Sequence, residues 1–197
     1  MVKTLILNTP EPFINAFNEC LSENVCFNNY FRRSYIKLIP KKDNFDTMAR
    51  WRPITIASAV FKLYSKLLYN RLEKITDRIL GSSQKGFRPS KNINDVPLNI
   101  KAKIDSLFKN NKEALLLNLD FSRAFDTINF THIYETLDFF GFNKKFIEII
   151  ENYLDGGKSC VDIEDGSYTN FFNIEIGVGQ GMPLSVLLFK LQLNPYF

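Results

Sequence analysis

Apolar residues recur along the chain at two spacings, which predict helices and strands in alternation. Spacings of three and four residues are typical of helices with one buried face. They predict helices over residues 13–21, 60–79, 94–108, 131–140 and 143–154, and a last helix that begins at Pro183. Shorter apolar runs predict strands over 35–39, 114–121, 159–164 and 168–174, and an extended segment over 51–54. The pattern thus predicts a chain that contains both helices and strands.

The most informative strand runs from Ala114 to Phe121. Its alternation places Leu115, Leu117 and Leu119 on one face and brings Asp120 out on the other, at the strand's carboxyl end. Two other positions are expected to contain a turn or a helix end. Asp165-Gly166 is a dipeptide typical of a tight hairpin turn, and Gly81 is expected to close the long helix.

The composition fits a folded domain. With 197 residues, 45% of them hydrophobic, the chain is long and apolar enough for one or two domains with a sizeable core. It contains no run of roughly 20 apolar residues that would span a membrane, and its first residues lack the features of a signal peptide. An intracellular location follows, nuclear or cytoplasmic rather than secreted, with no membrane partner.

Charge is divided unevenly between the two halves. Residues 1–91 hold 16 Lys and Arg against 7 Asp and Glu, whereas residues 92–197 hold 9 against 14. The basic half suits a polyanion such as nucleic acid, although a solvated basic face gives the same composition. Three cysteines, at positions 20, 26 and 160, and the single His132 are too few and too scattered for a zinc site.

Two segments carry candidate chemistry. In the first, Asp120 follows a buried strand, a position suited to a divalent metal in a nucleotidyl transferase that uses two ions. The plainer reading is that Asp120 caps a turn, Asp126 caps the next helix, Arg123 pairs with an acid and Phe125 packs in the core. Local spacing alone leaves both readings open.

The second segment, Gly177 to Ser185, places three glycines and Gln180 before the last helix. Glycine lets a backbone approach a ligand closely, and a helix N-terminus favours anions. The spacing of this segment matches neither a dinucleotide-binding fingerprint nor a P-loop, which needs a Gly-Lys-Ser/Thr sequence that residues 177–185 do not contain. Taken alone, the segment also fits a mobile turn.

Together, these segments resemble the motifs of one family, the reverse transcriptases of non-LTR, LINE-like retrotransposons and, more distantly, of group II introns. Leu119 to Ile128 is similar to the first catalytic motif, and Gly179 to Ser185 to the Gln-Gly-x-Pro-Leu-Ser motif. The fingers motifs are matched upstream, over residues 39–42 and 51–54, at Lys62, and over residues 70–72 and 84–89. The resemblance covers residues 13–197.

The resemblance implies roles for individual residues. Asp120 corresponds to the catalytic, metal-binding aspartate and Phe121 to the residue whose carbonyl joins the metal shell, with two Mg²⁺ ions in the complete enzyme. Phe125 corresponds to the aromatic ring that favours dNTPs over rNTPs. The residues expected at the nucleotide are Phe125, Gln180, Gly181 and Arg52, and those expected at nucleic-acid phosphates are Lys62, Lys66, Arg71 and Arg88.

The implied fold is α+β, the fingers and palm of a right-hand polymerase, with helices packed on a small, incomplete antiparallel sheet. Residues 1–95 correspond to the fingers region and residues 96–197 to part of the palm. The implied activity is RNA-directed DNA polymerisation, in which dNTPs extend the 3′-hydroxyl of a DNA primer on an RNA template. The motifs carry no information on oligomeric state.

Two departures from the family pattern bear on activity. Val186 replaces a second proline after Pro-Leu-Ser, and no Asp-Asp dipeptide occurs in the sequence. The family's Asp-Asp hairpin and thumb are expected beyond Phe197, so we expect no polymerisation by this chain alone. Three alternatives remain: a non-catalytic remnant that only binds nucleic acid, an RNA-dependent RNA polymerase, against which Phe125 argues, and a chain that does not fold stably by itself.

Overall fold

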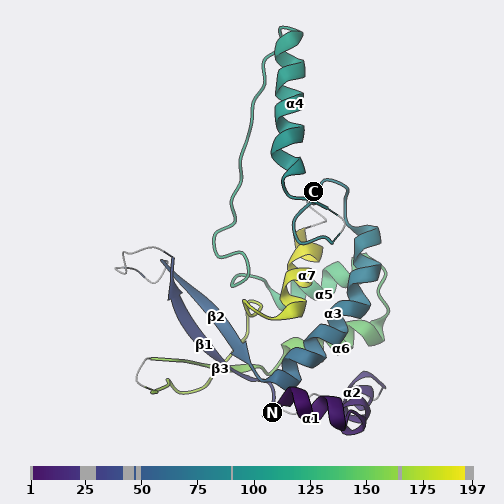
Figure 1. Ribbon diagram of the computed structural model, residues 1–197, viewed down its shortest axis with the longest axis vertical. Coiled ribbons are helices and arrows are strands. Elements are labelled where there is room, and N and C mark those ends of the chain that lie inside the picture. Colours follow the sequence, from purple (N-terminus) through teal and green to yellow (C-terminus); the bar gives the residue numbers. More distant parts are fainter. Residues whose placement is uncertain are drawn as a thin grey trace.

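The computed structural model describes residues 2–22, 30–41, 47, 50–89, 91–163 and 166–193 (Figure 1). The helices and strands confirm the α+β class, and every helix predicted from apolar spacing is present. In chain order they are α1 (Val2–Asn8), α2 (Glu11–Ser22), β1 (Arg33–Pro40), β2 (Trp51–Ala57), α3 (Ala59–Ile79), α4 (Asp95–Lys109), α5 (Phe130–Phe139), α6 (Lys144–Leu154), β3 (Lys158–Val161), β4 (Phe172–Asn173) and α7 (Pro183–Leu193).

The sheet is mixed rather than antiparallel, which corrects the sequence-based expectation. Its strand order is β2-β1-β3-β4, with antiparallel β1–β2 and β3–β4 pairs and a parallel β1–β3 pair. A parallel pair requires a long crossover, and helices α3 to α6 supply it between β1 and β3. The buried hydroxyls of Ser34 on β1 and Ser159 on β3 are hydrogen-bonded across the parallel pair.

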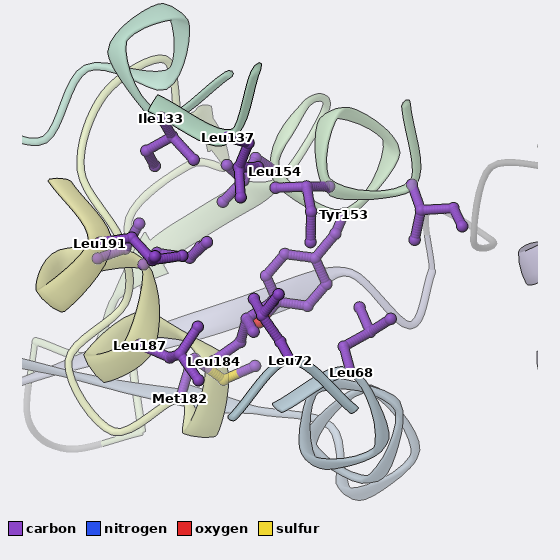
Figure 2. Close-up of a cluster of buried hydrophobic side chains, with 14 of the residues drawn as sticks. Leu68, Leu72, Ile133, Leu137, Tyr153, Leu154, Met182, Leu184, Leu187 and Leu191 are labelled. Atoms are coloured by element: carbon purple, nitrogen blue, oxygen red, sulfur yellow. The ribbon is translucent and has the colours of Figure 1, made fainter. Parts of the chain in front are cut away.

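The core lies between α3, α5, α6 and α7 (Figure 2). Leu72, Leu137, Ile150, Leu184 and Leu187 are 0% exposed, and they come from all four helices. Each buried leucine of this kind is worth about 2–5 kcal/mol against truncation to alanine. The expected regions 1–95 and 96–197 therefore share one hydrophobic core.

A polar contact inside this core fixes the helices relative to one another. The Tyr153 hydroxyl of α6 donates to Ser65 Oγ of α3 at 2.9 Å, and Ser65 Oγ also accepts from the backbone N–H of Leu184 on α7 at 3.2 Å. Loss of a buried partner of this kind leaves polar groups unsatisfied, at about 1–3 kcal/mol each. One side chain thus joins three helices.

Side-chain caps set where several helices begin. Ser58 accepts from the N–H of Phe61 at the start of α3, and Asn143 accepts from the N–H of Phe146 at the start of α6. At the other end of α3, Leu80 rather than Gly81 is the C-cap, because the Leu80 N–H donates to the Thr76 carbonyl at 2.9 Å.

The predicted strand over residues 114–121 is wrong. This segment has no strand pairing, and Leu115, Leu117 and Leu119 are 97%, 75% and 70% exposed. A strand needs a neighbour to hydrogen-bond with, and none of the described strands pairs with it. Figure 1 shows the segment running back from α4, which stands away from the helical body and has no buried residue.

The predicted hairpin over 159–174 is confirmed in outline. Strand β3 pairs with the short β4, and an isolated bridge joins Asp162 to Tyr168 between them. Asp165 of the predicted turn lies outside the described residues, while Gly166 has a φ of +76°. Cys20 and Cys160 form no disulfide within the described residues, and Cys26 lies outside them.

Candidate active site

The two segments singled out for chemistry lie side by side. The N–H of Gly177 donates to the Ile128 carbonyl at 2.8 Å, and the N–H of Val178 donates to the Phe125 carbonyl at 2.9 Å. On its other side the same loop reaches β2, where the Thr55 N–H donates to the Gln180 carbonyl at 2.8 Å. Backbone hydrogen bonds thus hold residues 177–181 between the turn after Asp120 and the sheet.

Packing and backbone conformation within the protein favour glycine in this loop, and the expected contact of Gly181 with a nucleotide stays a prediction. A Cβ at Gly177 would lie 2.7 Å from the Asp126 carbonyl oxygen, and one at Gly179 would lie 2.9 Å from Thr55 Oγ1. Gly181 has a φ of +105°, in the region that favours glycine. The chain itself is therefore a close neighbour of these glycines.

A cleft of about 430 Å³ opens where the loop, β1, β2 and the turn meet. This volume is within the range of small-molecule sites, about 300–1,000 Å³. Of the described residues that line it, Lys41, Arg52 and Arg123 are cationic, and Asp126 carries a carboxylate. Gln180, whose amide nitrogen donates to Asp126 Oδ1 at 2.9 Å, forms part of the wall. The structure thus brings Arg52 and Gln180 together, two of the residues expected at a nucleotide.

Asp126 has a role that the sequence reasoning missed. The cap reading is wrong, because Asn129 is the N-cap of α5 and accepts from the Thr131 N–H at 2.9 Å. Asp126 instead faces the cleft and fixes the Gln180 side chain. The sequence did contain a signal for this contact, because Asp126 ends one motif and Gln180 lies in the other. Arg123 has a φ of +52°, and no ion pair with either neighbouring acid occurs in the described part of the chain.

Asp120 and Phe121 lie on the exposed segment that leads into the turn. Among the residues that the structure describes, no group of three His, Cys, Asp or Glu side chains is close enough to hold a metal ion. The described residues therefore do not make up a metal centre on their own. The prediction that Asp120 and the Phe121 carbonyl bind two Mg²⁺ ions stays a prediction, and no chemical step is assigned to a metal here.

Phe125 is half-buried and lies against the last helix. Its ring stacks on Phe189 of α7 with the ring centroids 4.9 Å apart, while its carbonyl accepts from Val178. The ring does not line the cleft beside Arg52 and Gln180. The part of the plainer reading that placed Phe125 against the core is confirmed, whereas its expected contact with a sugar stays a prediction.

Three of the four residues expected at phosphates lie on α3. Arg71 is exposed, Lys62 is partly exposed, and the Lys66 ammonium lies 4.0 Å from the centroid of the Tyr69 ring. These side chains are placed on a helix surface where a polyanion can reach Lys66 and Arg71.

Arg88 differs from the other three. Its side chain is 6% exposed, and its Nε donates to Asp77 Oδ1 at 2.7 Å. Its remaining donors point to backbone carbonyls, including those of Gly81 at 2.8 Å and Asp77 at 2.9 Å. The expectation that Arg88 contacts phosphate is therefore corrected: these bonds fasten the loop after α3, and burial keeps the guanidinium from a polyanion.

Comparison with known proteins identifies the family of the chain. The sequence model of "Reverse transcriptase (RNA-dependent DNA polymerase)" matches residues 39–197, which is most of the chain. The chain belongs to the reverse transcriptase family. This reverse transcriptase domain is of the non-LTR retrotransposon kind that its motifs indicated.

Three relatives place the domain more closely. It is 32% identical over 157 residues to a retrovirus-related Pol polyprotein from type-1 retrotransposable element R2 of Popillia japonica, covering 80% of this chain and 22% of that protein. It is 30% identical over 156 residues to the Pol polyprotein of element R2DM of Drosophila melanogaster, covering 79% and 14%. It is 26% identical over 165 residues to a transposon TX1 149 kDa protein of Xenopus laevis, covering 84% and 12%. The domain thus spans less than a quarter of the length of each relative.

A solved structure supports the fold. The apo telomerase of Candida tropicalis, truncated from its C-terminal domain, aligns with a TM-score of 0.58 at 19% identity, covering 86% of this chain and 39% of that one. The polymerase-type α+β fold is thereby confirmed. Reverse transcriptase domains generally use divalent metal ions. Within the described residues, no helix is both long and apolar enough to cross a bilayer.

Proposed function

We propose that this domain is the incoming-nucleotide part of an RNA-directed DNA polymerase. In the complete enzyme, dNTPs would extend the 3′-hydroxyl of a DNA primer on an RNA template, with Mg²⁺ as the divalent ion. The observation that carries the proposal is the cationic cleft at the junction of the two motifs and β2. Residues 1–95 would serve as fingers and residues 96–197 as part of the palm.

The charge of the cleft fits a triphosphate. Lys41, Arg52 and Arg123 present three cations to one carboxylate, and a polyanion is attracted to a concave site with that balance. Arginine is suited to phosphate because its planar guanidinium donates two parallel hydrogen bonds. Arg52 lies on β2, Lys41 directly follows β1, and Arg123 lies in the turn, so the three cations reach the cleft from separate parts of the chain.

The wall of the cleft that carries Gln180 suits the base and sugar of the nucleotide. Asp126 accepts a hydrogen bond from the side-chain amide of Gln180 at 2.9 Å, and Thr55 of β2 donates one to the backbone carbonyl of Gln180. Both the side chain and the backbone of Gln180 are therefore held before any ligand binds. Gly181 follows at an exposed position with a φ of +105°. A preorganised wall of this kind reduces the entropy cost of ordering a ligand.

Nucleotide binding tests the proposal directly on the purified domain. We expect Arg52→Gln to weaken binding of a fluorescent dNTP about tenfold, the loss typical of one charge-assisted phosphate contact. Arg50→Gln is the matched control, since Arg50 is an exposed arginine two residues away that does not line the cleft. Equal affinities for both variants and the unmodified domain would remove the cleft as the triphosphate site.

Polymerisation is tested in a longer protein that contains this domain. We expect Asp120→Asn to abolish primer extension there while leaving folding unchanged, because Asp120 is exposed. For the domain alone we expect no extension, and robust Mg²⁺-dependent extension by it would contradict that expectation.

A non-catalytic role in nucleic-acid binding is the second candidate, favoured by the surplus of Lys and Arg in residues 1–91. It predicts RNA binding that weakens as salt rises, and weakens further when Lys66 and Arg71 are reversed in charge. RNA binding without dNTP binding in the cleft would favour this candidate over the polymerase.

A further inference from the structure

The loop after α3 presents an aromatic ring to solvent in a backbone conformation that is uncommon for phenylalanine. Phe87 is 64% exposed and has a φ of +56°. Left-handed backbone at a bulky residue is costly and persists only where the surroundings hold it. The ring borders an open depression of about 540 Å³ that is also lined by Lys85, Pro89, Lys91 and Ile93.

Two buried cations hold the backbone beneath this ring. Lys190 of α7 is 2% exposed, and its ammonium donates to the Phe87 carbonyl at 2.8 Å. Arg88, the next residue, is fastened to Asp77 and to the Gly81 carbonyl. Burial lowers the pKa of the Lys190 ammonium, and the Phe87 carbonyl together with the charges of Glu73 and Asp77 partly offsets this effect. The contacts of Lys190 and Arg88 thus fix the loop backbone and hold the Phe87 ring in its exposed position.

The loop that carries the ring is basic. No Asp or Glu occurs in the sequence between Asp77 and Asp95. With Arg88 committed to Asp77, the cations left at the rim of the depression are Lys85 and Lys91. Ile93 and Pro89 add apolar surface to the depression, and the aromatic ring between two lysines is the combination that binds single strands through base stacking and phosphate contacts.

We propose that Phe87 is a stacking platform for an unpaired base of single-stranded nucleic acid, with Lys85 and Lys91 contacting the adjoining phosphates. The proposal rests on the proposed function, because it assigns a contact to the strand that the polymerase would read. Lys190 and Arg88 are positioning residues: they touch no nucleic acid and fix the loop that carries the ring.

Binding of short unstructured RNA and DNA oligonucleotides to the purified domain tests the proposal. We expect Phe87→Ala to weaken binding about tenfold, within the range measured for loss of one stacked base, and Phe87→Tyr to retain it. The matched control is Phe139→Ala, which removes a ring on α5 that is 74% exposed and lies outside the loop. Thermal unfolding of Phe87→Ala should match that of the unmodified domain, because the ring is mostly exposed.

Two further measurements separate stacking from charge. Phe87→Ala should leave the dependence of RNA affinity on salt unchanged and should not alter binding to heparin, a polyanion without bases. Lys85→Gln should reduce the magnitude of the salt slope by about 0.7. RNA or DNA binding by Phe87→Ala equal to that of the unmodified domain would overturn the stacking proposal while leaving the polymerase proposal standing. An unmodified domain that binds neither oligonucleotide would instead contradict both.

Discussion

Substitution of Gly177 by alanine tests whether the two motifs are held together as the structure indicates. Gly177 has a φ of +85°, and alanine in left-handed backbone costs about 1–2 kcal/mol. The new Cβ would also lie 2.7 Å from the Asp126 carbonyl oxygen and 3.0 Å from two further Asp126 backbone atoms. Those backbone atoms cannot rotate away, so we add about 1–3 kcal/mol for overpacking. The expected loss in the free energy of unfolding is about 2–5 kcal/mol.

Gly141 provides a matched control for this substitution. Its φ of +76° is close to that of Gly177, but a Cβ there would meet nothing within 4 Å. Gly141→Ala should therefore show only the backbone cost, about 1–2 kcal/mol. Urea unfolding monitored by circular dichroism gives both free energies, and the difference between the variants isolates the contact with Asp126. Equal losses at the two positions would refute the packing of the loop against the turn.

Two further variants test other parts of the structure. Arg88→Gln should lower the free energy of unfolding by about 2–4 kcal/mol, because it leaves Asp77 and buried carbonyls without their donor. The control Arg78→Gln, at an exposed arginine, should change it by about 0.5 kcal/mol or less. Equal values for the two variants in urea unfolding would contradict the buried role of Arg88. Burial raises the pKa of Tyr153 well above its usual 10.0, so above that pH the unfolded state loses a proton that the folded state keeps, and stability falls. Tyr153→Phe should make this fall shallower in unfolding free energies measured between about pH 9 and about pH 11, and an unchanged pH slope would exclude the buried phenol as a source.

The helices could be predicted from the sequence because each depends on nearby residues. The apolar spacing of the long helix over 60–79 reflects one face packed on α7, and its start at Ser58 is a local hydrogen bond. The same holds for α5 and α6, where Asn129 and Asn143 are caps. Side chains within a few residues of each other supply these signals, and no knowledge of distant parts of the chain is needed.

The predicted strand over 114–121 shows what local pattern leaves out. Its leucines alternate as a strand requires, but alternation records only which residues are able to share a face. Whether a strand forms depends on a partner elsewhere in the chain, and the parallel pairing of β1 with β3 depends on it equally. Residue spacing therefore shows neither that residues 114–121 lack a partner strand nor that β1 pairs with β3.

The sequence predicted which residues belong to the candidate site better than it predicted the contacts that they make. Motif resemblance singled out Arg52 and Gln180, which the structure brings to one cleft. It did not identify Asp126 as the partner of Gln180, because the two lie 54 positions apart. Nor could it distinguish Arg88 from the lysines of α3, because an arginine that holds a loop and one that meets phosphate look alike in sequence.

The parallel pairing of β1 with β3 bears on how the domain acquires its structure. The hydrogen-bonded Ser34 and Ser159 are 125 positions apart. Contacts between such distant residues require closure of a long loop, which slows folding. During synthesis, the β1–β2 hairpin and α3 are complete long before β3 leaves the ribosome, so β1 waits with one edge unpaired. An open strand edge is prone to pair with other chains, and we therefore expect this domain to depend on low concentration or chaperones while it folds.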